Sequence, residues 1–227
     1  MPLADFQTLV TDLSRDDAGK VSVAQRDAAL AQAVERYSQD RPRDKVEDIN
    51  GLGTQLLDLP AGWQDGFSTL TQLEYPIGNV PPTLVPHDDI SIYQTPTGQQ
   101  IQLRYAVTNA AANVRVTYTV KHVLDAGTDT IPASHRTPVA AWAAADLCEQ
   151  LASFYAGQTD STIQADAVDH KSKSAEFASR ARALRKRYTD ELGVNDRRNT
   201  ASGVVVALTD RDSRGQPRLT HPLSYRV

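Results

Sequence analysis

The sequence predicts an α+β fold, in which a helical bundle is interrupted by an inserted antiparallel β-sandwich or small barrel and followed by an extended C-terminal tail. Apolar residues recur at three- and four-residue steps near the start and over residues 137–192, as on one face of a helix. Between these segments the apolar pattern alternates, and Pro and Gly become frequent. We therefore divide the chain into N-terminal helices (1–42), an inserted β domain (43–133), a closing helical hairpin (134–193) and a tail (194–227).

The closing hairpin gives the strongest helical pattern. Its first arm is expected to start with Thr137 as N-cap before a proline, and to end at Gly157. Its second arm has apolar residues at one-turn spacing up to Leu192, and Gly193 offers a left-handed C-terminal cap. The link at residues 158–163 is too rich in hydroxyl and carboxylate side chains to continue either helix. Each arm has one apolar stripe, so we expect the arms to pack against each other.

Two shorter helices are predicted at the start of the chain. Residues 3–13 place Leu, Phe and Val on one face. Ser22 can cap a second helix that continues to Tyr37, and the sequence Asp40-Arg41-Pro42 ends it.

The β region contains one clear strand at residues 114–120, where Val and Tyr alternate with Arg, Thr and Lys. Residues 90–93 and 101–104 flank the sequence Thr-Pro-Thr-Gly, which predicts a β-hairpin. Residues 55–59 and 71–75 are weaker strand candidates. Short strands with close turns predict the compact sandwich or barrel.

Composition is that of an ordinary folded protein, with 227 residues of which 40% are hydrophobic and 23% charged. The net charge of −4 argues against a dedicated nucleic-acid binder. The single cysteine, Cys148, is expected to be a small core residue rather than a nucleophile. We see no signal-peptide pattern and no membrane-span pattern, and we expect synthesis in the cytoplasm.

Few residues form a pattern typical of catalysis or metal binding. The sequence His87-Asp88-Asp89 is expected to be a solvated turn, because adjacent residues on a loop rarely converge on one ion. The glycines of Gly51-Leu52-Gly53 lack the third glycine of a dinucleotide fingerprint and are expected to form a turn.

A second group of ionisable residues, Asp166, Asp169 and His170, falls at the start of the second arm, where the helix dipole alone explains carboxylates. We therefore predict no enzyme activity, no metal and no cofactor. A small hydrolase using His87 or His170 is the alternative.

The second arm carries the strongest charge feature, a basic cluster that divides between two faces of the helix. This spread is typical of a solvated surface with ion pairs to neighbours. A contact face for another subunit or an acidic partner is the alternative. The cluster comprises Arg180, Arg182, Arg185, Lys186 and Arg187.

The tail combines arginines with one short apolar run, Val-Val-Val-Ala-Leu at residues 204–208. A frayed, solvated terminus is one interpretation. We favour an arm that becomes ordered on a partner, with the apolar run adding a strand or filling a groove. The residues predicted to dock are Arg197, Arg198, Val204, Val205, Val206, Leu208, Arg211, Arg214, Arg218, Tyr225 and Arg226.

The sequence Leu-Ala-Ser-Phe-Tyr-Ala-Gly at residues 151–157, followed by Lys-Ser-Lys-Ser at 171–174 and a basic helix, resembles the closing segment of tailed-bacteriophage head-to-tail adaptor (head completion, connector) proteins. Recognisable sequence covers residues 137–192, and the order of helices, β region, helices and tail fits the rest. The resemblance implies a structural virion protein that forms a ring, of about twelve copies in the family, beneath the portal protein. The ring would extend the DNA channel and provide a platform for the neck or tail.

The same resemblance implies that residues 194–227 dock on the portal. It also implies a place at the head–tail interface of the virion after assembly in the host cytoplasm. DNA would pass through the channel without sequence-specific binding, which suits a negative net charge. No membrane and no cofactor are implied. Another neck or tail-terminator ring protein is the alternative within this class.

Overall fold

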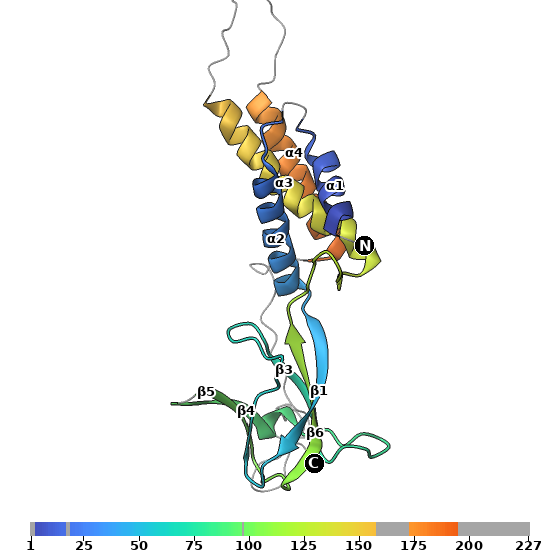
Figure 1. The fold of residues 1–227 in the computed structure, drawn as a ribbon, viewed down its shortest axis with the longest axis vertical. Coiled ribbons are helices and arrows are strands. Elements are labelled where there is room, and N and C mark those ends of the chain that lie inside the picture. Colours follow the sequence, from blue (N-terminus) through green and yellow to red (C-terminus); the bar gives the residue numbers. More distant parts are fainter. Residues whose placement is uncertain (1–2, 17–18, 97, 158–172, 195–227) are drawn as a thin grey trace, which may run out of the picture. The chain divides into compact units, whose positions relative to one another are not determined.

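A computed structural model of the chain describes residues 3–16, 19–96, 98–157 and 173–194. These residues form four α-helices and two three-stranded antiparallel sheets, which confirms the predicted α+β class (Figure 1). Each sheet is open in the described part of the chain, because each strand order has two ends. None of the described helices is long and apolar enough to cross a membrane.

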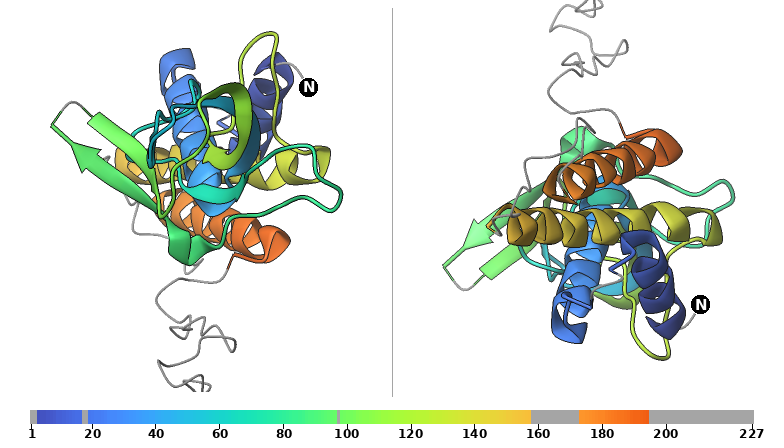
Figure 2. Two further views of the ribbon diagram at one scale, coloured as in Figure 1. Left: turned by 90° about the horizontal axis from the view of Figure 1, so that it is seen from below. Right: turned by 90° about the horizontal axis from the view of Figure 1, so that it is seen from above.

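The helices come from both ends of the described chain. Helices α1 (Leu3–Ser14) and α2 (Val23–Asp40) precede the strands, whereas α3 (Arg136–Ala156) and α4 (Lys173–Leu192) follow them. Helix α3 packs against each of the other three and lies between α4 and the N-terminal pair (Figure 2). These helices share one hydrophobic core.

Helix α3 is buried on more than one side. Its buried residues include Ala140, Ala141, Ala143, Ala144 and Ala145, which together span about 200° of the helix circumference. The prediction of a single apolar stripe facing the second arm was therefore incomplete. Alanine allows three neighbouring helices to approach closely, because it adds little volume to the contact.

The ends of the helices test the predicted caps. Ser22 caps α2, where its side chain accepts a hydrogen bond from the Gln25 backbone in a full capping box. Gly193 has φ +61 after α4, as predicted. The prediction for α3 was wrong, because Thr137 is its second residue and His135 occupies the N-cap position. A preceding 3₁₀ turn, η2 (Ala133–His135), starts the helical winding earlier than the Thr-Pro sequence indicates.

The first sheet has the order β1-β6-β3, with β1 at Arg43–Gly51, β3 at Leu70–Glu74 and β6 at Ala110–Val120. Strand β6 includes the predicted strand, and Val114, Val116 and Tyr118 on it are buried. Strand β1 was not predicted individually. It carries five charged residues among nine, so its alternation of exposed and half-buried positions is not visible as an apolar pattern.

The second sheet has the order β2-β5-β4. Strands β4 (Ile90–Thr95) and β5 (Gly98–Leu103) form the predicted hairpin, while β2 is confined to Leu56–Leu57. Residues from both sheets form a second hydrophobic core, separate from that of the helices.

Gly51 was predicted in a turn but is the last residue of β1. A Cβ at this position would lie far inside van der Waals distance of the Thr108 carbonyl oxygen, so the strand end requires glycine. Gly53 forms the turn with φ +73.

A short polar network links α2 to the segment after β6. Lys121 Nζ lies 2.7 Å from Glu35 Oε1. His122 is 9% exposed, and its Nε2 lies 3.0 Å from the carbonyl oxygen of Arg41. These contacts join the two ends of the β insertion to the helical part.

Candidate interaction surfaces

The basic cluster on α4 is largely paired with acidic residues of the same chain. Arg185 connects α4 to α3, because its Nη2 lies 3.0 Å from Asp146 Oδ1 and 2.7 Å from Glu149 Oε2. Its guanidinium also lies 5.3 Å from the centre of the Trp142 ring, at cation–π distance. Arg185 therefore contributes to the packing of the hairpin itself.

The other members of the cluster point to different surroundings. Lys186 pairs with Asp190, and Arg187 with Glu191, each one turn further along α4. Arg180 Nη1 lies 3.3 Å from the carbonyl oxygen of Ser14, the last residue of α1. Arg182 is exposed and pairs with no acidic residue in the described part of the chain. These pairs neutralise most of the cluster's charge.

Two groups of predicted site residues lie outside the described residues. These are the ionisable residues Asp166, Asp169 and His170, and all the predicted docking residues of the tail. The polar link at residues 158–163 lies outside them too.

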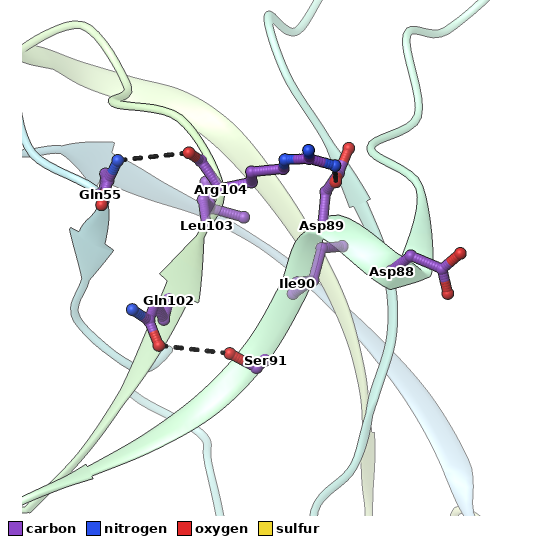
Figure 3. Close-up of a pocket in the computed structure, with 8 residues that line it drawn as sticks. All are labelled: Gln55, Asp88, Asp89, Ile90, Ser91, Gln102, Leu103 and Arg104. Atoms are coloured by element: carbon purple, nitrogen blue, oxygen red, sulfur yellow. Dashed lines mark hydrogen bonds and ion pairs between the residues drawn. The ribbon is translucent and has the colours of Figure 1, made fainter. Parts of the chain in front are cut away.

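A shallow pocket of about 320 Å³ lies where β4 and β5 begin and end, lined by Asp89, Ser91, Arg104 and their neighbours (Figure 3). Arg104 Nη1 lies 3.3 Å from Asp89 Oδ1 and closes one side of the pocket. On the other side, Ser91 Oγ faces Gln102 Oε1 at 3.5 Å (Figure 3). Ser91 therefore faces an amide oxygen, which is not a base that could activate its hydroxyl.

His87 lies beside this pocket, in the 3₁₀ turn η1 (His87–Asp89) that precedes β4. Its side chain is exposed, and Asp88 is exposed as well. This is the solvated turn that the sequence predicted. Within the described residues, no group of three His, Cys, Asp or Glu side chains is arranged to hold a metal ion.

Cys148 is buried in the helical core, as predicted. Burial raises the pKa of its thiol to about 11, so the thiol is protonated at neutral pH. A protonated, buried thiol is not available as a nucleophile.

One exposed segment was missed by the sequence reasoning, the loop at residues 76–86 after β3. It contains four prolines and no charged residue. Val80 is 97% exposed and Leu84 is 53% exposed. Hydrogen bonds at its base hold the loop, with Tyr75 N–H donating to the Thr83 carbonyl and Val85 N–H to the Leu73 carbonyl. The signal was available in the sequence as an uncharged run of eleven residues beside a strand.

Strand β4 presents a second apolar surface. Ile92 is 40% exposed and Tyr93 is 48% exposed, on opposite faces of the strand. Like Val80 and Leu84 in the loop at residues 76–86, these side chains are large, apolar and exposed. The described surface is thus suited to contacts with other proteins.

No family model and no curated protein sequence matches the chain. Among solved structures, it is similar to a chain in the neck of an empty gene transfer agent particle computed with C6 symmetry, with 15% identity, a TM-score of 0.27, and coverage of 83% of this chain and 88% of that one. A chain in the neck of the native particle, computed with C12 symmetry, gives 16% identity and a TM-score of 0.26, with coverage of 83% and 92%. TM-scores this low do not establish a shared fold.

Proposed function

We propose that the chain is a structural virion protein, a head-to-tail adaptor that forms a ring beneath the portal of a tailed-phage-type particle. The ring, of about twelve copies, extends the DNA channel and provides the docking platform for the neck or tail. Residues 194–227 reach from this platform to the portal. Copies assemble in the host cytoplasm and become part of the virion neck.

The observation that supports this proposal most is the helical pair α3 and α4. It coincides with the segment that resembles the adaptor family, and α3 is the central helix of the bundle. The order of elements also matches the order that the resemblance to the adaptor family implies, since helices α1 and α2 precede the β insertion and α3 and α4 follow it.

The exposed surface supports a protein that works through contacts. Val80 and Leu84 on one loop and Ile92 and Tyr93 on β4 are apolar and exposed. The net charge of −4 suits the wall of a channel that DNA must pass without being held, because strong phosphate neutralisation would retain the DNA.

The test compares the mass and shape of the purified chain alone and mixed with portal rings, by light scattering and negative-stain imaging. A monomer that forms rings on the portal supports the proposal. Deleting residues 203–227 is expected to leave the monomer folded and to abolish portal binding. A chain that ignores portal rings but binds tail tubes would instead be a tail-terminator or other neck protein.

A further inference from the structure

Among the described residues, one edge of strand β4 pairs with no other strand, and the strand carries no charge. It is the last strand in the order β2-β5-β4, and its sequence Ile-Ser-Ile-Tyr-Gln-Thr contains no charged residue and no proline. Its pairing with β5 is regular from Ile90 to Thr95, with no bulge. A regular, uncharged edge of this kind is a template for another strand, and proteins normally protect it.

Strand β1, an edge strand of the other sheet, has features that protect it against the addition of a strand. It carries Arg43, Asp44, Lys45, Glu47 and Asp48, and its register shifts between Ile49 and Gly51. Charges and a bulge both oppose the addition of a strand. The absence of both from β4 is therefore a difference between two edges of the same molecule.

Two backbone hydrogen bonds define which groups of β4 face the free edge. Arg104 N–H donates to the Asp89 carbonyl on the β4 side of β5, whereas Leu103 N–H donates to the Gln55 carbonyl on the β2 side. Bonding directions alternate along an antiparallel strand, so Gln102 and Gln100 also bond toward β4.

Ser91 and Tyr93 stand opposite Gln102 and Gln100 and use their backbone groups for β5. Ile92 therefore directs its N–H and carbonyl away from β5, to the free edge. The exposed side chains of Ile92 and Tyr93 lie on opposite faces, so an added strand would meet apolar surface on both faces.

We propose that this edge accepts residues 204–208 of a neighbouring copy as an added strand. The sequence is uncharged from residue 199 to 209, and three successive valines give residues 204–208 the strongest strand preference in the tail. An uncharged, β-branched segment matches an uncharged edge, because main-chain hydrogen bonds supply the affinity and the flanking apolar side chains supply the fit.

The choice of a neighbouring copy rests on the proposed ring. A cyclic ring requires a heterologous contact, in which one surface of each copy meets a different surface of the next. Pairing of β4 with β4 of a second copy would close as a dimer, whereas pairing of β4 with the tail of the next copy continues around a ring. Arg211, Arg214, Arg218 and Arg226 follow the apolar run and remain available to the portal.

The experiment is disulfide cross-linking between two full-length variants of different size, one of them carrying a tag. One copy carries Ile92→Cys, and the tagged copy carries a cysteine in turn at each of residues 204–208. Cys148 does not compete because it is buried. Mild oxidation is carried out with the protein alone and with protein mixed with portal rings, and circular dichroism checks that each variant is folded.

The matched control replaces Ile92→Cys by Val46→Cys, which places an exposed cysteine on the charged edge strand β1. A cross-linked pair of tagged and untagged chains is expected with Ile92→Cys, at about tenfold the yield of the control, because strand pairing raises the local concentration of the two thiols. Equal yields, or no cross-link at any of the five tail positions, would overturn the inference. A variant with both cysteines in one chain that forms only an internal disulfide would also overturn it, since the edge would then hold its own tail.

Portal binding separates this inference from the proposed function. If rings bind portals but the cross-link does not form, the strand contact is excluded and the adaptor function is still supported. A cross-link in a chain that does not bind portal rings would support the strand contact and exclude the adaptor function.

Discussion

The backbone N–H of His122 donates a hydrogen bond of 2.9 Å to the hydroxyl of Ser38, joining the segment after β6 to the last turn of α2. The Ser38 side chain is fully buried and donates in turn to the Val34 carbonyl at 2.7 Å. Ser38→Ala would leave the N–H of His122 buried without an acceptor. We expect a loss of about 1–3 kcal/mol in the free energy of unfolding, measured by urea denaturation.

Ser91→Ala is the matched control for that substitution. Ser91 is exposed, and its hydroxyl lies 3.5 Å from Gln102 Oε1. Its removal should change the free energy of unfolding by less than about 0.5 kcal/mol. A loss for Ser38→Ala as small as that for Ser91→Ala would mean that the link between α2 and the β region does not contribute to stability.

The His122 side chain should make stability depend on pH. Burial lowers its pKa below the ordinary value, although the carbonyl oxygens of Arg41 and Thr130 oppose this change. As pH falls, the unfolded chain therefore binds this proton before the folded chain does. The stabilising contribution is complete above the ordinary histidine pKa of about 6.5 and decreases as pH falls through it.

Denaturant titrations between pH 8 and pH 5 would measure this effect. His122→Asn is expected to be less stable at pH 8, where the wild-type contacts are intact, and to lose less stability on acidification. Arg43 and His135 also lower the pKa of His122, so the comparison is the difference in slope between variant and wild type. Parallel pH profiles would exclude His122 as the titrating group.

Local chemistry in the sequence predicted the features that depend on a few neighbouring residues. Ser22 and Gln25 form their capping box within one turn of α2, and Gly193 adopts its left-handed conformation after α4. Thr137 failed as a cap because the residues before it already wind as a 3₁₀ turn. Arg136, the residue after that turn, pairs with Asp129 of the preceding loop, a contact that the Thr-Pro sequence does not encode.

Features that depend on residues far apart in the chain were harder to predict from the sequence. The basic cluster was recognised, but Asp146 and Glu149, which pair with Arg185, lie 39 and 36 residues away. The pairing follows from the packing of α4 on α3, which spacing within one helix does not encode. Strand β1 was missed for a related reason, since its charged residues gain their alternation only by pairing with β6.

Gly51→Ala should be among the most destabilising single-methyl additions in the chain. The new Cβ would meet the Thr108 carbonyl oxygen and the Asn113 side chain, which itself accepts a hydrogen bond from Gly51 N–H at 2.7 Å. We expect a loss of about 1–3 kcal/mol or more, because backbone must move to relieve the clash. Gly127→Ala meets nothing closer than 3.8 Å and should cost far less. Similar thermal midpoints for the two variants would contradict this close approach.

Cys148 should be unreactive in the folded protein. Its thiol is buried, and burial raises its pKa to about 11, so both access and ionisation oppose attack on a thiol reagent. With a chromogenic disulfide reagent at pH 8, labelling should proceed at the rate of unfolding, and added denaturant should make it fast. Immediate labelling of the native protein would show that the packing of α3 against α1 opens readily.

Arg185→Ala should weaken the α3–α4 hairpin. The substitution removes contacts with Asp146 and Glu149 and the cation–π contact with Trp142, so we expect a loss of about 1 kcal/mol or more in the free energy of unfolding. Lys186→Ala removes only an exposed pair with Asp190 and should cost less than about 0.5 kcal/mol. High salt should reduce the difference between the two variants only in part, because screening acts on the ion pairs but little on the packing of the guanidinium against the Trp142 ring. Complete loss of the difference in salt would assign the whole effect to charge and none to that packing.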